Sequence, residues 1–96
     1  MSDDIGPEFW KRADAVINLA NEQCEVASRS KVSASLLYAA ARFNSFIVAS
    51  SAANLDELRL DKGEAIKYFT EQYQKMLTEN LDDHIANYEK YLGKDS

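Results

Sequence analysis

The stretch VSASLLYAAARFNSFIVASSAA, residues 32–53, decides the fold of this chain. It contains seven Ala, five Ser and one charged residue, Arg42, whereas the rest of the chain is dense in charge. A helix with small and apolar residues on every side is usually one that neighbouring elements enclose. We therefore expect an all-α protein: a compact antiparallel bundle of three to four helices, with a central Ala/Ser-rich helix over about 31–53.

Length and composition agree with this fold class. Ninety-six residues suffice for one domain, and 46% hydrophobic with 28% charged residues is an ordinary globular balance. The sequence shows no sustained apolar/polar alternation and no Asn-Gly or Asp-Gly hairpin signal, which disfavours a β-sheet. We expect a single helical domain over 1–96, with flexible ends at 1–5 and 94–96.

On the N-terminal side, a helix is expected to begin at Pro7, because proline suits the first helical position. Ser28-Arg29-Ser30 then marks a break, with Ser as the preferred cap of the next helix. The predicted N-terminal helix is amphipathic, with apolar residues every three or four positions: Phe9, Ala13, Val16, Ala20, Cys24 and Ala27.

On the C-terminal side, Asn54 is expected to cap a helix, the apolar pattern runs on to Leu92, and Gly93 is expected to end it. One helix over 56–92 would be about 55 Å long, so an interruption is expected. Asn80, followed by two aspartates, resembles a second cap. We therefore favour one helix to about residue 79 and a shorter one from about 81, with a continuous kinked helix as the alternative.

Charge and cysteine content limit the class of partner and the compartment. The net charge is −5 and no basic stripe could neutralise several phosphates, which disfavours nucleic acid as a partner. The acidic start does not resemble a signal peptide, and Arg42 with Asn44 at the middle of the 32–53 stretch disfavours a membrane span. The single cysteine, Cys24, fits a reducing environment. We expect a cytoplasmic protein without membrane contact.

One segment could bind an anion. Arg29, Ser30 and Lys31 stand where the 31–53 helix begins, and free backbone N–H groups at that end favour negative charge. No glycine-rich turn accompanies them. The favoured interpretation is therefore capping and local salt bridges, with Lys31 pairing with Glu22 or Glu25.

Two polar residues stand in the least polar helix. Arg42 and Asn44 are candidate polar anchors, because a charge there must either reach water or meet a carboxylate. Pairing with an acid of a flanking helix is favoured; an exposed interaction site and a ligand anchor are the alternatives.

Aromatic residues gather in the C-terminal third. Tyr68 and Phe69 are adjacent and cannot face the same way, so one of them should lie at a rim or an interface. Packing in the core and at its rim is the favoured interpretation, and a surface for protein binding or self-association is the main alternative. The candidate surface comprises Tyr68, Tyr73, Tyr88 and Tyr91.

The sequence offers no catalytic constellation. His84 is the only histidine, and Leu81 and Asn80, three and four residues before it, supply no metal ligand. Cys24 lies on an apolar stripe, where a small buried hydrophobe is its commoner role. We expect no metal, no cofactor, no catalytic residues and no enzyme activity.

Four segments of the chain resemble a family of small bacterial proteins of unknown function: FWKRAD (9–14), SKVSASLLYAAARFN (30–44), YFTEQY (68–73) and ENLDD (79–83). The resemblance covers nearly the whole chain and implies a bacterial, cytoplasmic, helical protein. It supplies no activity and no binding residues. The leading hypothesis is therefore a non-enzymatic helical module for protein–protein interaction or self-association. The alternative is a small-ligand or anion-binding protein that uses the start of the 31–53 helix.

Overall fold

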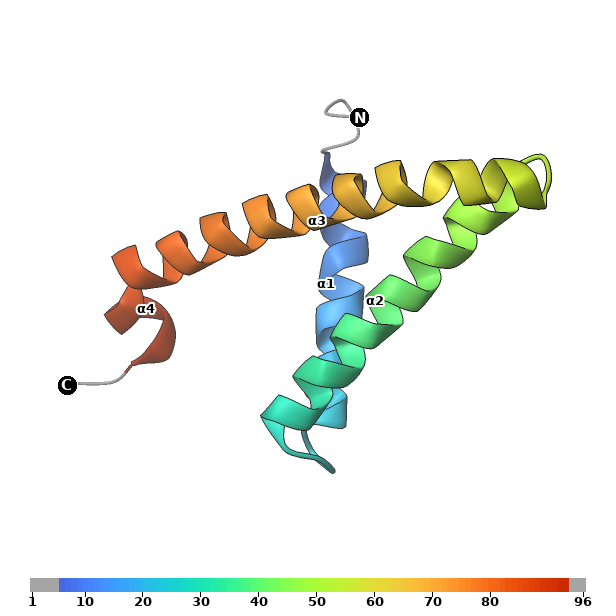
Figure 1. The fold of residues 1–96 in the computed structure, drawn as a ribbon. Coiled ribbons are helices and arrows are strands. Elements are labelled where there is room, and N and C mark those ends of the chain that lie inside the picture. The colour runs from blue at the N-terminus through green and yellow to red at the C-terminus, as the bar shows by residue number, and fades with distance from the viewer. Residues whose placement is uncertain (1–5, 94–96) are drawn as a thin grey trace. The chain divides into compact units, whose positions relative to one another are not determined.

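The computed structural model describes residues 6–93, and they form four helices in the order α1 to α4 (Figure 1). The bounds are α1 Pro7–Gln23, α2 Arg29–Ser51, α3 Leu55–Ala86 and α4 Tyr88–Leu92. No strand occurs in residues 6–93. The all-α fold class is confirmed. The ends at 1–5 and 94–96, predicted to be flexible, lie outside the described residues.

Local sequence signals set most of the helix ends. Pro7 follows the cap residue Gly6 and opens α1, as predicted. The Asn54 side chain accepts a hydrogen bond from the backbone N–H of Glu57 at 2.8 Å, which caps α3. Gly93 has a φ of 62°, the left-handed conformation that favours glycine, and it ends α4.

The predicted interruption near Asn80 is wrong. Helix α3 runs without a break from Leu55 to Ala86, and the change of direction falls at Asn87, whose φ of −121° and ψ of 33° are not helical. The Asn80 side chain donates to the carbonyl of Met76 at 2.8 Å, inside its own helix. It therefore satisfies a group that is already helical and does not cap a new helix.

The chain divides into two compact units, Met1–Ile47 and Val48–Ser96, with the boundary inside α2. The prediction of a single domain stays a prediction. In the first unit α1 and most of α2 are joined by a turn at residues 24–28. In the second unit the end of α2 leads through residues 52–54 into α3 and α4.

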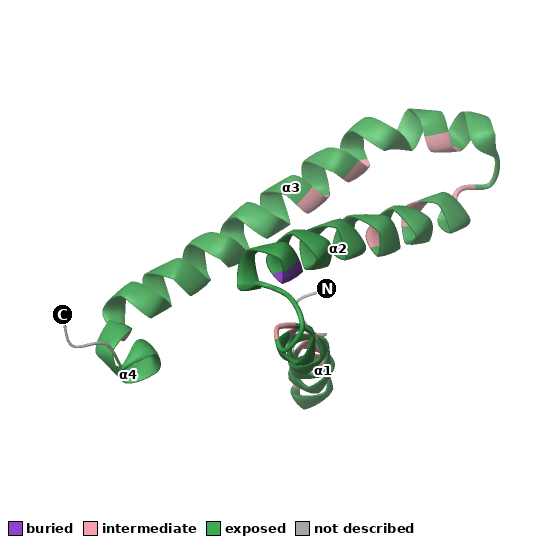
Figure 2. Ribbon diagram, turned by 90° about the horizontal axis from the view of Figure 1, so that it is seen from below, coloured by how far each residue is buried: buried purple, intermediate pink, exposed green. Residues whose placement is uncertain are grey.

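Burial differs from the expectation for α2. Val32 is the only buried residue in that helix and the only one in residues 6–93 (Figure 2). Within the first unit, α1 alone does not enclose the apolar sequence of α2. The half-buried residues of the second unit are Val48, Ala52, Leu58, Ala65, Phe69 and Asn87.

Candidate interaction surfaces

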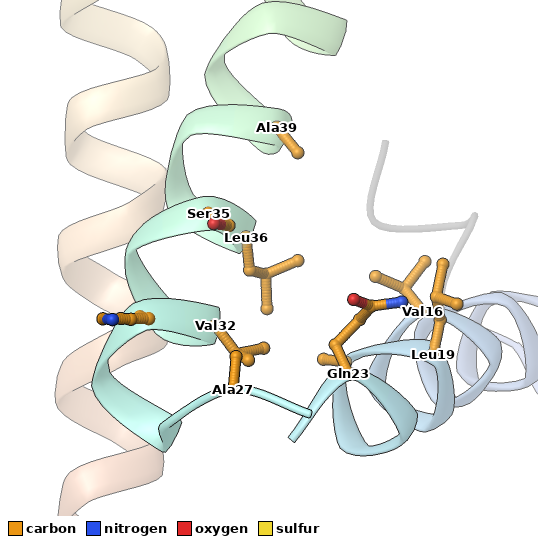
Figure 3. A pocket seen from close by; sticks show the side chains of 10 residues that line it. Val16, Leu19, Gln23, Ala27, Val32, Ser35, Leu36 and Ala39 are labelled. Atoms are coloured by element: carbon orange, nitrogen blue, oxygen red, sulfur yellow. The ribbon is translucent and has the colours of Figure 1, made fainter. Parts of the chain in front are cut away.

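The first unit contains an apolar cleft between α1 and α2, with a volume of about 320 Å³. Val16 and Leu19 of α1 lie opposite Val32 and Leu36 of α2 across this cleft (Figure 3). Val16 is 52% exposed and Leu19 is 58% exposed, so the walls are open to an apolar occupant. The complete lining is Val16, Leu19, Ala20, Gln23, Ala27, Lys31, Val32, Ser35, Leu36 and Ala39.

The predicted anion-binding residues lie together in the first turn of α2, and all three are exposed. The hydroxyl of Ser28 accepts a hydrogen bond from the backbone N–H of Lys31 at 3.3 Å and lies 3.4 Å from the hydroxyl of Ser30. A serine hydroxyl thus accepts a hydrogen bond from one of the free N–H groups of the first turn, as expected for a cap.

The expected ion pair of Lys31 is not formed. Within the described part of the chain the ion pairs are Glu8–Lys11 and Asp56–Arg59, each between residues three apart on one helix. Neither Glu22 nor Glu25 pairs with Lys31. The cationic end of α2 keeps its charge facing solvent.

Arg42 is exposed and Asn44 is half-buried, near the middle of α2. The favoured pairing of Arg42 with a carboxylate is absent from the ion pairs of residues 6–93, so its charge stays in water. Its backbone carbonyl accepts a hydrogen bond from the Ser45 hydroxyl at 2.9 Å. Arg42 stands about 16 Å along the helix from Lys31, so the two cations do not form one site.

The four candidate tyrosines are all exposed, and they fall into two pairs. Tyr68 and Tyr73 lie on α3, five residues apart and therefore about 140° apart around the helix. Tyr88 and Tyr91 lie on α4. The Tyr68 ring contacts the half-buried Phe69 edge to face, with centroids 5.1 Å apart, so Tyr68 is the outer member of that adjacent pair.

A polar cluster at the junction of α3 and α4 was not predicted. The rings of His84 and Tyr91 meet edge to face at 5.3 Å, and Lys90 Nζ lies 5.9 Å from the Tyr91 ring centroid. The Asn87 amide donates to Asp83. The pKa of Tyr91 is raised, first by a hydrogen bond to the Asp83 carboxylate and second by the negative charge of that carboxylate. Residues 83, 87 and 91 are spaced four apart, and side chains four apart are neighbours on a helix. That spacing could have predicted the cluster from the sequence.

Two features bear on reactive chemistry in the part of the chain that the structure describes, the metal-ligating side chains and the cysteine. No group of three or more potential metal-ligating side chains occurs in residues 6–93. Cys24, expected to be buried, is half-buried. By length and composition α2 could cross a membrane, a test that core helices of soluble proteins also pass.

Comparison with known proteins places the chain in a family. The model of a family described as protein of unknown function, DUF3144, matches residues 9–85, and the chain belongs to this family. The chain is similar to the protein NB7890A from Shewanella sp., solved by NMR, with 30% sequence identity and a TM-score of 0.77. The match covers 95% of this chain and 97% of that one. None of the curated proteins matches it.

Proposed function

We propose that this chain is a non-enzymatic helical module for protein–protein interaction or self-association in the bacterial cytoplasm. The observation that carries the proposal is the exposure of its apolar side chains. Val32 is the single buried residue among residues 6–93, while both walls of the α1–α2 cleft and much of α3 expose large apolar groups.

Exposed apolar groups have a cost that association removes. Single apolar side chains on a surface are normal, but contiguous ones indicate an interaction site. Covering them releases about 25 cal/mol for each Å² of apolar area removed from water. Aromatic residues favour such contacts, and the four candidate tyrosines are available to make them.

The test is affinity capture of a tagged chain, both from a bacterial lysate and from cells that express a second copy with a different tag. We expect a near-stoichiometric protein, either the second copy or another protein, retained at low and at high salt. Failure to retain any protein, the second copy included, would contradict the proposal.

Tyrosine variants locate the surface. Tyr68→Ala with Tyr73→Ala tests α3, and Tyr88→Ala with Tyr91→Ala tests α4. Loss of the captured protein with unchanged helicity by circular dichroism is expected for at least one pair. If both double variants capture as much as the parent chain, the tyrosine surface is wrong.

A further inference from the structure

We propose that the bend at Asn87 is one of two positions of the C-terminal segment, and that the contact between the rings of Tyr91 and His84 holds the segment in the bent form. Once this contact is released, α3 and α4 join into one helix that ends at Leu92, which we call the straight form. The change takes place within a single chain, so it does not depend on the proposed function or on any partner.

The torsion angles of one residue separate the two helices. Asn87 is the only non-helical residue between Leu55 and Leu92, and α4 turns away from the axis of α3 there (Figure 1). The Asn87 N–H donates to the carbonyl of Asp83, and the Asn87 carbonyl accepts from the N–H of Tyr91, both at 3.0 Å. Helical hydrogen bonds are thus present on either side of the bend. Moving φ from −121° and ψ from 33° into the helical region would therefore join α3 and α4.

Nothing in the local sequence imposes the bend. No glycine or proline occurs between residues 64 and 92. Asparagine is a weaker helix former than alanine but is tolerated within helices, as Asn80 is within α3. The first N–H groups of α4, those of residues 88–90, have no acceptor within that helix, and the straight form would give them the carbonyls of residues 84–86. The straight form is therefore compatible with this sequence.

The bent form is held by contacts that a straight helix cannot make. The rings of His84 and Tyr91 meet edge to face with centroids 5.3 Å apart. In a straight helix these two residues would lie about 10.5 Å apart along the axis, which would separate the rings. Asp83, whose carboxylate accepts from the Tyr91 phenol, would lie about 12 Å from Tyr91 along the axis. The bonds between Asn87 and Asp83 join residues four apart and are possible in both forms, so Tyr91 distinguishes the two.

Straightening would change the surface at the C-terminal end. Leu81 and Ile85 are exposed on α3, and Tyr88 and Leu92 are exposed on α4. Their spacings of four, three and four residues place all of them on one face of a continuous helix. In the bent form Asn87 interrupts that face. The straight form would therefore extend an exposed apolar stripe beyond Ile85 by about 10 Å.

Pulsed EPR between two nitroxide labels distinguishes the two forms. The labels are attached to a Gln74→Cys, Leu92→Cys, Cys24→Ser chain. In the straight form positions 74 and 92 are five full turns apart, about 27 Å along the axis, and the bend shortens this distance. We expect the shorter distance to predominate in this labelled chain.

Tyr91→Ala in the labelled chain should increase the ratio of the longer to the shorter distance about fivefold, as expected for the loss of one aromatic pair. His84→Ala removes the other ring of the contact and should act in the same direction. Tyr88→Ala is the matched control, since it removes a ring of the same kind from α4, outside the contact with His84, and it should leave the ratio unchanged.

NMR of the chain without labels provides an independent measurement. In Tyr91→Ala the Cα chemical shift of Asn87 should move toward the helical value, and hydrogen exchange of the amides of residues 88–90 should slow. If Asn87 stays non-helical and the shorter distance persists, the inference is overturned. It is also overturned if residues 88–92 lose their helical chemical shifts, because release would then unfold α4 and not extend α3. Neither outcome affects the capture experiment, which tests the proposed function separately.

Discussion

The side-chain amide of Asn87 donates to both the backbone carbonyl and the carboxylate of Asp83, at nitrogen–oxygen distances of 3.1 and 3.0 Å. These bonds connect the last turn of α3 with the residue at which the chain turns into α4. The Asp83 carboxylate also acts on Tyr91 of α4, so one acidic side chain serves both sides of the junction.

Asp83→Ala should therefore loosen α4. The loss of one net hydrogen bond costs about 1 kcal/mol, which corresponds to an about fivefold larger population of the open state. Hydrogen exchange of the Tyr91 and Gly93 amides, which donate to Asn87 and Glu89, measures that opening. Asp82→Ala removes the same charge one residue earlier and is the control. Equal exchange rates in the two variants would show that the Asp83 contacts do not hold α4.

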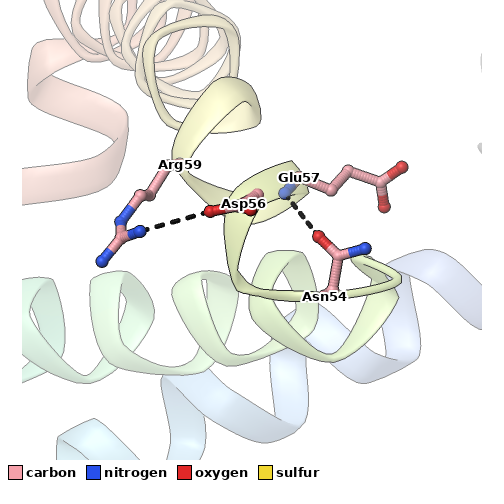
Figure 4. Close-up of polar contacts among 4 residues, drawn as sticks. All are labelled: Asn54, Asp56, Glu57 and Arg59. Atoms are coloured by element: carbon pink, nitrogen blue, oxygen red, sulfur yellow. Dashed lines mark hydrogen bonds and ion pairs between the residues drawn. The ribbon is translucent and has the colours of Figure 1, made fainter.

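The cap of α3 gives a second prediction. Asn54 accepts from the Glu57 N–H (Figure 4), and the Glu57 carboxylate in turn accepts from the Ala53 N–H. Asn54→Ala should lower the free energy of unfolding by about 1 kcal/mol, since a free N–H loses its acceptor. Asn54→Asp, which keeps an acceptor oxygen, should change it by much less. Urea unfolding followed by circular dichroism compares them, and equal losses would mean that the cap contributes nothing.

Tyr91 should make the α3–α4 junction sensitive to alkaline pH. Its pKa is raised in the folded chain above the ordinary value of 10.0, because the Asp83 carboxylate accepts from the phenol and repels the phenolate. The neutral phenol is thus favoured by folding. Its contribution to stability is complete below pH 10 and is lost as the pH rises through the folded pKa.

Absorbance of tyrosinate near 295 nm follows this titration. We expect part of the tyrosinate absorbance to develop at higher pH than the rest, and Tyr91→Phe should remove that part. Asp83→Ala should move it to lower pH, while Tyr88→Phe should leave it in place. A late fraction that survives Tyr91→Phe would assign the shift to a different tyrosine.

The first turn of α2 allows a test of anion binding. Because the Ser28 hydroxyl already accepts from the Lys31 N–H, we expect millimolar phosphate to raise the melting temperature no more than chloride at equal ionic strength. A rise of several degrees that disappears in an Arg29→Ala, Lys31→Ala variant would instead establish the ligand-binding alternative.

Helix α2 also makes a membrane test necessary, since Arg29–Ser51 is long and apolar enough to span a bilayer. An arginine at the centre of a spanning helix costs about 3 kcal/mol, so we expect the chain to stay in the unbound fraction when lipid vesicles are floated. Arg42→Leu removes this cost and should shift the chain toward the vesicles. Flotation of the parent chain would contradict the expectation.

The sequence predicted the helix ends that depend on local chemistry. Pro7, Asn54 and Gly93 act through their own backbone geometry or a bond three residues away, so neighbouring residues are enough to identify them. Asn80 shows the limit of such rules. An asparagine can cap a new helix or bond to the carbonyl four residues back, and the sequence does not distinguish these outcomes.

The environment of individual side chains was harder to predict. Arg42 was expected to pair because α2 was expected to be enclosed, and both expectations depend on tertiary contacts that periodicity does not encode. The Asp83–Tyr91 contact joins two helices across an unpredicted break. Tyr68 was predicted better, because adjacent residues on a helix must point in different directions.

The burial of Val32 alone among residues 6–93 has a consequence for the life of this protein in a cell. Short helices in water gain most of their stability from packed apolar faces, so a chain with one buried residue draws little folding energy from its own interior. Under the proposed association, its native state would be governed by mass action, and dilution would favour unfolding. A copy without a partner would be a substrate for proteases, and the cellular supply of partner would set the amount of protein that persists.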